Sequence, residues 1–200
     1  MSDVAEKTKT ALVYSFGLCM KKPLTEKNAH DQLYDAFKPL RDDWYQAQGD
    51  ENRRIQFIQK DDALLCRSSV EPKGLPFKQN EIEITDGEKI KIVVRLPAMR
   101  RLKKNEITRS VPIKSEDKDD YYSAILNRNG MEVDVIDWEE RRENTVFFTN
   151  KKKKVTIPVD DVVAIVTITD AEDFIKSMQQ GVGRYKTYGC GMIEILKTKA

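Results

Sequence analysis

Residues 162–196 read VVAIVTITDAEDFIKSMQQGVGRYKTYGCGMIEIL and contain four predicted elements in a fixed order. The run 162–169 is apolar and β-branched, which predicts a buried strand. Thr169 or Asp170 caps a predicted helix that extends to Gln180 and stops at Gly181. A glycine-rich loop follows, and residues 191–196 predict the last strand. This order is typical of the second half of a βαββαβ unit.

The preceding segment supplies the first half of that unit. Residues 89–96 (KIKIVVRL) predict a strand, and residues 119–127 predict a short helix with Tyr122, Ile125 and Leu126 on one side. Two further strands are expected at 131–138 and 144–149. We expect the basic stretch 99–112 to be irregular.

The N-terminal part of the chain repeats the theme. Residues 7–20 predict a strand, and Thr25 or Asn28 begins an amphipathic helix that ends near Pro39. Strands are expected at 54–59, 63–70 and 81–85, with a Pro- and Gly-broken segment at 71–80. The predicted fold class is therefore α+β, with tandem ferredoxin-like (RRM-like) βαββαβ domains at 1–80 and 81–200 and a glycine-rich loop near the C-terminus.

Composition excludes several classes of protein. The 200 residues are 40% hydrophobic and 34% charged, which excludes both a wholly disordered chain and a membrane-spanning helix, since no apolar run approaches the ~18 residues of a membrane span. The polar start MSDVAEK predicts a cytoplasmic protein. The three cysteines are far apart and are expected to be reduced and buried. His30 is the one histidine, which excludes a His-based metal cage, and we expect no cofactor.

Positive charge is concentrated in three segments. The net charge is only +2, but residues 89–114 carry +8, Lys151–Lys154 carry +4 and residues 181–200 carry +3, which leaves −13 for the rest. A local positive field can bind a polyanion even when the total charge is near zero. For Lys151–Lys154 alone, a solvated loop is the alternative interpretation.

The loop QQGVGRYKTYGCG, residues 179–191, is the most informative motif. Its glycines allow backbone N–H groups to approach phosphates, and Arg184 and Lys186 add positive charge. Alternatively, Gly181 stops the helix, and Gly189 and Gly191 admit a close strand. The loop is neither a Walker motif nor a dinucleotide fingerprint, because it follows a helix and contains no GK[ST].

This loop and the segment from Thr167 that leads into it resemble the C-terminal signature of the CasE family, the CRISPR precursor-RNA endoribonucleases of type I-E systems. The similarity extends to Arg95-Leu96, to residues 111–114 and to residues 28–34. The resemblance implies two ferredoxin-like domains, binding of a repeat RNA stem-loop and metal-independent cleavage at the 3′ base of the stem. It also implies retention of the product RNA and partnership with the other Cascade subunits, with no membrane association.

The resemblance also implies a catalytic histidine near the start of the first helix, the position of His30. Imidazole titrates near neutrality and can act as base or acid when a ribose 2′-OH attacks its own 3′-phosphate to give a 2′,3′-cyclic phosphate. Lys27 stands where the family has a tyrosine, one turn earlier, and can stabilise the phosphorane or protonate the leaving group. Tyr34, four residues later, can orient the ring.

Basic and glycine residues are the candidates for RNA binding. They are Arg95, Arg100, Arg101, Lys103, Lys104, Lys151, Lys152, Lys153, Lys154, Gly181, Gly183, Arg184 and Lys186. Lys151–Lys154 are expected to form a hairpin tip that follows the phosphates of a stem, and Tyr185 and Tyr188 are either base-stacking or core residues. Two alternatives remain: a non-catalytic RNA-binding subunit with an idle His30, and a small-ligand regulatory protein on the same fold.

Overall fold

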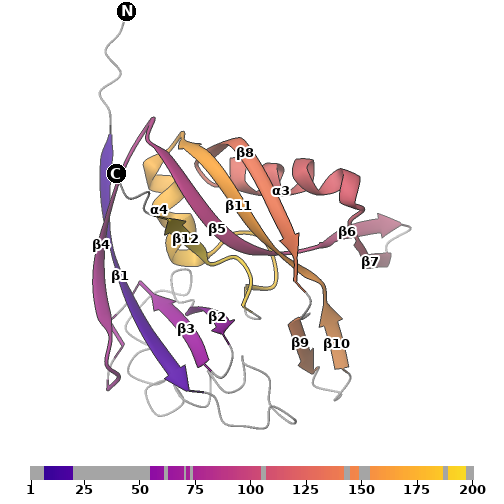
Figure 1. Cartoon of the computed structure of the whole chain (residues 1–200), viewed down its shortest axis with the longest axis horizontal. Helices are drawn as coiled ribbons and strands as arrows, with labels where there is room; N and C mark the ends of the chain where they lie inside the picture. Colours follow the sequence, from indigo (N-terminus) through magenta and orange to yellow (C-terminus); the bar gives the residue numbers. More distant parts are fainter. Residues whose placement is uncertain are drawn as a thin grey trace, which may run out of the picture.

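The structure is a computed structural model, and it describes residues 7–19, 55–60, 63–69, 71–72, 74–104, 107–141, 145–148, 154–186 and 189–196. These residues form two four-stranded antiparallel sheets, each with a hydrophobic cluster of its own (Figure 1). The mixed α+β class predicted from the sequence is therefore confirmed.

The first sheet has the order β2-β3-β1-β4. Its strands are β1 (Thr8–Cys19), β2 (Gln56–Lys60), β3 (Ala63–Ser68) and β4 (Lys78–Thr85). The four strands expected in this half are confirmed, although β4 begins three residues earlier than predicted. The helix expected from Thr25 to Pro39 lies outside the described residues.

The second sheet has the order β12-β5-β11-β8. Its elements are β5 (Lys89–Pro97), α3 (Lys118–Asn127), β8 (Met131–Glu140), β11 (Val159–Ile168), α4 (Ala171–Gln180) and β12 (Ile193–Leu196). In both sheets the first and third strands of the unit are central and the second and fourth are at the edges. This is the arrangement of a ferredoxin-like βαββαβ unit, so the tandem prediction is confirmed.

Local signals explain the ends of α4. The Asp170 carboxylate accepts hydrogen bonds from the amides of Glu172 and Asp173, both at 3.0 Å, and this satisfies two N–H groups that the helix leaves open. At the other end Gly181 takes a φ of +75°, which a side chain rarely adopts. The Asp170 cap and the Gly181 stop expected from the sequence are both present.

Two small hairpins project from the second sheet. One consists of β6 (Met99–Lys104) and β7 (Ile107–Pro112) and is followed by a 3₁₀ turn, η2 (Ser115–Asp117). The other consists of β9 (Thr145–Phe148) and β10 (Lys154–Ile157). The prediction that residues 99–112 are irregular is wrong, because cross-strand pairing orders a stretch whose sequence lacks a clear apolar alternation.

The two halves are joined by polar contacts from β2 to α4 and from β3 to β12. The Gln56 amide donates to the carbonyl of Met178 at 2.8 Å, and the Arg67 guanidinium donates to the carbonyl of Ile193. Ile84 of β4 belongs to the core of the second half. All of β4, residues 78–85, pairs with β1 of the first sheet, which favours a domain boundary after Thr85. The domain division after residue 80 that the sequence suggests stays a prediction.

Candidate nucleic-acid interface

The glycine-rich loop, residues 181–191, joins α4 to β12 and is held by close backbone packing. Gly191 has a φ of +84°, and a Cβ at this position would lie 2.1 Å from the carbonyl oxygen of Val182. The amide of Val182 donates to the carbonyl of Gly191 at 2.8 Å, and the amide of Gly191 donates to that of Arg95 at 2.8 Å. A side chain at position 191 is therefore disfavoured twice, by the positive φ and by the lack of room for a Cβ atom.

Most amides of the loop are used within the protein. The amide of Gly181 donates to the carbonyl of Ser177, that of Gly189 to the carbonyl of Lys186, and that of Cys190 to the carbonyl of Tyr185. In the described part of the chain, the amides of Gly183 and Arg184 have no hydrogen-bond partner. Among the described residues of the loop, Gly183 and Arg184 have amides that are available to a phosphate, while Gly181 serves as a helix stop.

The β6–β7 hairpin, the end of β10 and the glycine-rich loop, which are far apart in the sequence, meet at one small apolar cluster. Ile157 at the end of β10, Val159 at the start of β11 and Cys190 of the loop are buried together, and Met99 of β6 and Tyr185 of the loop pack against them. We call this group the junction cluster. It brings the β6–β7 hairpin, the base of the β9–β10 hairpin and the glycine-rich loop to one end of the second sheet.

Polar contacts strengthen the junction. The Tyr185 and Ser110 hydroxyls lie 3.4 Å apart, and the Tyr121 hydroxyl of α3 donates to the carbonyl of Met99 at 3.1 Å. Burial raises the pKa of Tyr121, and the nearby positive charge of Arg184 opposes that rise. Tyr185 packs against the junction cluster while partly exposed, with a φ of +58°.

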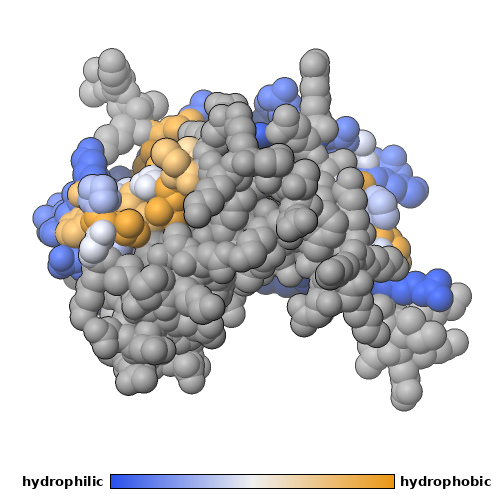
Figure 2. Space-filling model, turned by 90° about the horizontal axis from the view of Figure 1, so that it is seen from below, coloured by the Kyte–Doolittle hydropathy of each residue, from blue (hydrophilic) through white to orange (hydrophobic). Residues whose placement is uncertain are grey.

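Among the residues whose side chains the structure describes, the exposed basic ones around the junction cluster come from residues 89–114 and from the glycine-rich loop. Arg100, Arg101 and Arg184 are exposed, and hydrophilic residues gather at the right of Figure 2, where the β6–β7 hairpin lies. Arg100 lies 3.7 Å from Asp117 in a pair open to solvent, which holds it only weakly. Lys186 is half-buried.

The lysine candidates are placed only in part. Lys103 and Lys104 are the last two residues of β6, and Lys154 is the first residue of β10, where it pairs with Phe148. Lys151, Lys152 and Lys153 lie outside the described residues. The return strand of their hairpin is β10, which begins within the lysine run and which the sequence did not indicate.

Arg95 is placed differently from the other basic candidates. Its side chain is buried in β5, and its Nε donates to Asp161 Oδ1 at 3.0 Å. The same carboxylate accepts from Arg141 at 3.2 Å. Arg95 is therefore paired within the sheet and is not one of the exposed basic side chains of the junction.

The predicted catalytic residues His30, Lys27 and Tyr34 all lie outside the described residues, so their roles stay predictions. Among the residues that the structure does describe, no group of three or more His, Cys, Asp or Glu side chains could hold a metal ion. No helix of the described ranges is long and apolar enough to cross a membrane.

The three cysteines are free, but they differ in exposure. Burial raises the pKa of Cys66 and of Cys190 to about 12, which makes both thiols unreactive at neutral pH. Cys19 is exposed, contrary to the expectation that all three are buried.

Sequence reasoning missed two parts of this region. Arg109 stands opposite Leu102 in the β6–β7 register, and both are exposed. Recognising the hairpin would have revealed this pair. Lys118 is also basic, yet it is buried in an ionic cluster with Asp160 and Glu140, which no local pattern indicates.

Comparison with known proteins gives consistent results. The family model described as CRISPR associated protein matches residues 25–197. The structure is similar to CRISPR endoribonuclease Cse3 bound to a 19-nucleotide RNA, with a TM-score of 0.70, 15% identity and coverage of 94% of this chain and 100% of the other.

Two further solved structures share the fold. CRISPR-associated protein Cas6e from Escherichia coli K-12 gives a TM-score of 0.66 at 18% identity, covering 92% of this chain and 98% of that one. A chain of a CRISPR RNA-guided surveillance complex gives a TM-score of 0.57 at 13% identity, covering 91% of this chain and 98% of that one. Comparison with curated protein sequences gives no significant match.

Proposed function

The chain belongs to the CRISPR associated protein family, and from this we propose that it is an endoribonuclease that cuts CRISPR precursor RNA at the 3′ base of a repeat stem-loop. The meeting of the β6–β7 hairpin, the base of the β9–β10 hairpin and the glycine-rich loop at the junction cluster carries the proposal. Similar solved chains support it, since one is an endoribonuclease bound to RNA and another is part of an RNA-guided surveillance complex.

The geometry suits a folded RNA stem. A-form RNA is recognised mainly through its phosphates and its shape, because its major groove is too narrow for side chains to read. Two hairpins and a loop that project at one end of a sheet can contact phosphates on both strands of such a stem. Arg100 and Arg101 on one hairpin, Lys151–Lys154 on the other and Arg184 on the loop provide the charge.

The proposed reaction is a transesterification within the RNA. The 2′-oxygen forms a bond to the adjacent phosphorus, the bond from phosphorus to the 5′-oxygen breaks, and that oxygen takes a proton. His30 acts as the base or the acid, Lys27 stabilises the charge on the phosphorane, and Tyr34 orients the imidazole. The products are a 2′,3′-cyclic phosphate and a 5′-hydroxyl, and the reaction needs no metal.

The product stays bound, and the protein acts as a subunit of the Cascade complex. Retention follows from the chemistry, because cleavage at the base of the stem leaves intact the hairpin whose phosphates the basic segments hold. The substitution of Lys27 for the family's tyrosine favours one other candidate, an RNA-binding subunit of the same complex that does not cleave.

A cleavage assay on a repeat hairpin RNA in EDTA tests the reaction. The wild-type protein is expected to cleave, and His30→Ala is expected to abolish cleavage while changing the dissociation constant less than about threefold. Lys27→Ala should slow cleavage less than His30→Ala does. Unchanged cleavage by His30→Ala would refute the mechanism, and tight binding without cleavage by the wild type would establish the non-catalytic candidate.

A binding assay tests the interface. Replacing Lys151–Lys154 with Gln should weaken binding and reduce the slope of log K against log salt by about 3 to 4, if each lysine meets one phosphate. The control removes the same charge from the first sheet and the start of β5, by replacing Lys7, Lys9, Lys78 and Lys89 with Gln. Equal effects of the two variants would show that net charge, and not this interface, drives binding.

A further inference from the structure

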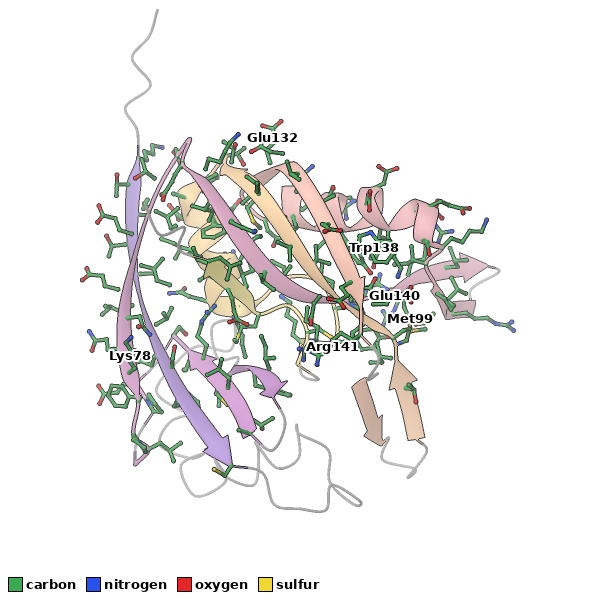
Figure 3. All side chains as sticks on the ribbon, in the orientation of Figure 1. Lys78, Met99, Glu132, Trp138, Glu140 and Arg141 are labelled. Carbon is green, nitrogen blue, oxygen red and sulfur yellow. The ribbon has the colours of Figure 1, made fainter. Side chains whose placement is uncertain are left out.

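The β9–β10 hairpin grows out of one pair of strands in the second sheet. Glu140 ends β8, and its register partner Asp160 lies next to the start of β11, so these two residues mark the base of the hairpin. Figure 3 shows Glu140 and Arg141 at the end of β8, where the chain leaves towards β9. The direction in which β9 and β10 leave the sheet therefore depends on what fixes this base.

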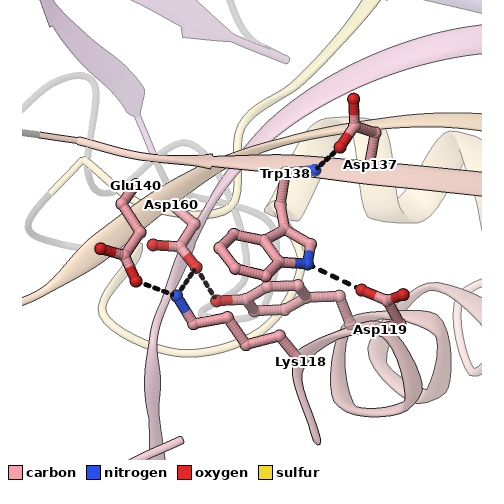
Figure 4. Close-up of polar contacts among 7 residues, drawn as sticks. Lys118, Asp119, Asp137, Trp138, Glu140 and Asp160 are labelled. Atoms are coloured by element: carbon pink, nitrogen blue, oxygen red, sulfur yellow. Dashed lines mark hydrogen bonds and ion pairs between the residues drawn. The ribbon is translucent and has the colours of Figure 1, made fainter. Parts of the chain in front are cut away.

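Lys118, the first residue of α3, connects both sides of the base. Its Nζ lies 2.8 Å from Glu140 Oε1 and 2.8 Å from Asp160 Oδ2, and 4.0 Å from the centre of the Trp138 ring (Figure 4). The Lys118 side chain is only 3% exposed. A buried ammonium is strongly unfavourable without partners, so the structure requires both carboxylates to stay where they are.

Lys118 and Glu140 are both charged near neutral pH. Burial lowers the pKa of Lys118, but hydrogen bonds to Asp160 and Glu140 outweigh that effect and leave the pKa raised. The hydrogen bond from Lys118 lowers the pKa of Glu140. Lys118 and Glu140 therefore attract each other as ions near neutral pH.

Neighbouring contacts tie the same cluster to α3. The Tyr122 hydroxyl, one turn after Lys118, donates to Asp160 Oδ2 at 2.7 Å. The Trp138 indole donates to Asp119 Oδ1 at 2.7 Å. The first turn of α3 is thus bonded to both strands from which the hairpin grows.

The opposite face of the sheet carries a second ionic contact. Successive residues of a strand alternate between faces, so Asp161 points away from the Lys118 cluster. It is bonded to Arg95 of β5 and to Arg141, the residue after β8. The amide of Arg141 also donates to the carbonyl of Val159 at 3.2 Å. The base is consequently held on both faces.

We infer that Lys118 is a positioning residue that fixes the direction of the β9–β10 hairpin by joining Glu140 and Asp160 at its base. The inference rests on the proposed function in that the hairpin's lysines are taken to bind RNA. A hairpin that is already ordered before RNA binds loses less entropy on binding, so a fixed base should increase its affinity for RNA. Lys118 itself is buried and contacts no RNA.

Distance measurement between two spin labels tests the positioning without RNA. The labels are placed at Glu132→Cys and Thr156→Cys, both exposed, in a Cys19→Ser background, because Cys66 and Cys190 are buried with pKa values near 12 and do not react. Glu132 and Glu140 are separated by about 26 Å along β8, which places the labels in the measurable range.

The unaltered cluster should give a narrow distance distribution. Glu140→Gln, at an exposed carboxylate, removes one contact and should broaden it, and Lys118→Met should broaden it further. Asp170→Ala is the control, since it removes a helix cap at the other end of β11 and should lower stability without broadening. A distribution that stays narrow in folded Glu140→Gln protein would overturn the inference, even if Lys118→Met fails to fold.

A double-mutant cycle connects the positioning to RNA. Glu140→Gln should weaken stem-loop binding by about tenfold with Lys151–Lys154 present and by less than about twofold when the four lysines are Gln. An equal loss of affinity in both backgrounds would overturn the positioning role, because the effect of Glu140→Gln would then not act through the lysines of the hairpin. If replacing the lysines alone leaves affinity unchanged, the RNA interface of the proposed function fails, whereas the positioning of the hairpin by Lys118 is decided by the label distances alone.

Discussion

Gly191→Ala tests whether the glycine-rich loop is held by close packing. The substitution places a Cβ at a φ of +84° and 2.1 Å from the carbonyl oxygen of Val182. The positive φ alone costs about 1–2 kcal/mol for an L-residue. The backbone must also move apart, which breaks the hydrogen bonds that join Gly191 to Val182 and to Arg95, each contributing about 1 kcal/mol.

Together these effects lower the free energy of unfolding by about 3–4 kcal/mol. For a chain of this length that corresponds to a fall of about 10 °C in Tm. The matched control is Gly87→Ala, because Gly87 has nearly the same φ, +83°, but nothing within 4 Å of its would-be Cβ. It isolates the cost of φ, about 1–2 kcal/mol.

The assay is urea denaturation of the wild type and of three alanine variants. Gly17→Ala is the second control, since Gly17 has neither a positive φ nor a close neighbour, and it should be neutral or stabilise by about 0.5 kcal/mol. The expected order of stability is Gly17→Ala, Gly87→Ala, Gly191→Ala. Equal losses in Gly87→Ala and Gly191→Ala would refute the close packing of the loop.

Three further measurements follow from the described contacts. Asp170→Ala should lower the free energy of unfolding by about 1 kcal/mol, with Asp170→Asn losing less; no loss would show that the carboxylate does not cap α4. Because Lys118 lowers the folded-state pKa of Glu140 below its ordinary 4.5, the stability from this contact is present above pH 4.5 and lost as the pH falls through the lowered value. Urea midpoints of the wild type and Glu140→Gln should therefore differ at neutral pH and converge in acid, and a constant difference would contradict the contact. A thiol reagent at pH 8 should modify Cys19 rapidly and Cys66 and Cys190 only on unfolding, so rapid reaction of all three would contradict their burial.

The parts of the fold that could be predicted are those with local causes. Helix α4 has its cap at Asp170 and its stop at Gly181 within the segment itself, and residues 162–166 of β11 (VVAIV) are an unbroken apolar run. The β6–β7 hairpin has no such signal, because MRRLKK shows no apolar face and is ordered by pairing with β7. A strand of this kind is specified by its partner.

The candidate site was predictable in composition but not in geometry. The three basic segments are visible in the sequence, but what brings them together is contact among Met99, Ile157 and Cys190, which look like ordinary apolar residues. Arg95 and Lys118 count as basic residues like any other, yet cross-strand and helix–sheet contacts pair them with Asp161 and Asp160 in the interior. Such pairs join residues about 40 to 70 positions apart, beyond the reach of any local pattern.

The RNA that co-purifies with the protein, and the chemistry of its ends, tests the proposed activity most directly. Our account predicts a repeat hairpin at the 3′ end of that RNA, a 2′,3′-cyclic phosphate on its last nucleotide and a 5′-hydroxyl at the other end, all absent when His30→Ala is purified in the same way. Co-purifying RNA with 3′-hydroxyl and 5′-phosphate ends, or the same cyclic ends from His30→Ala, would contradict it.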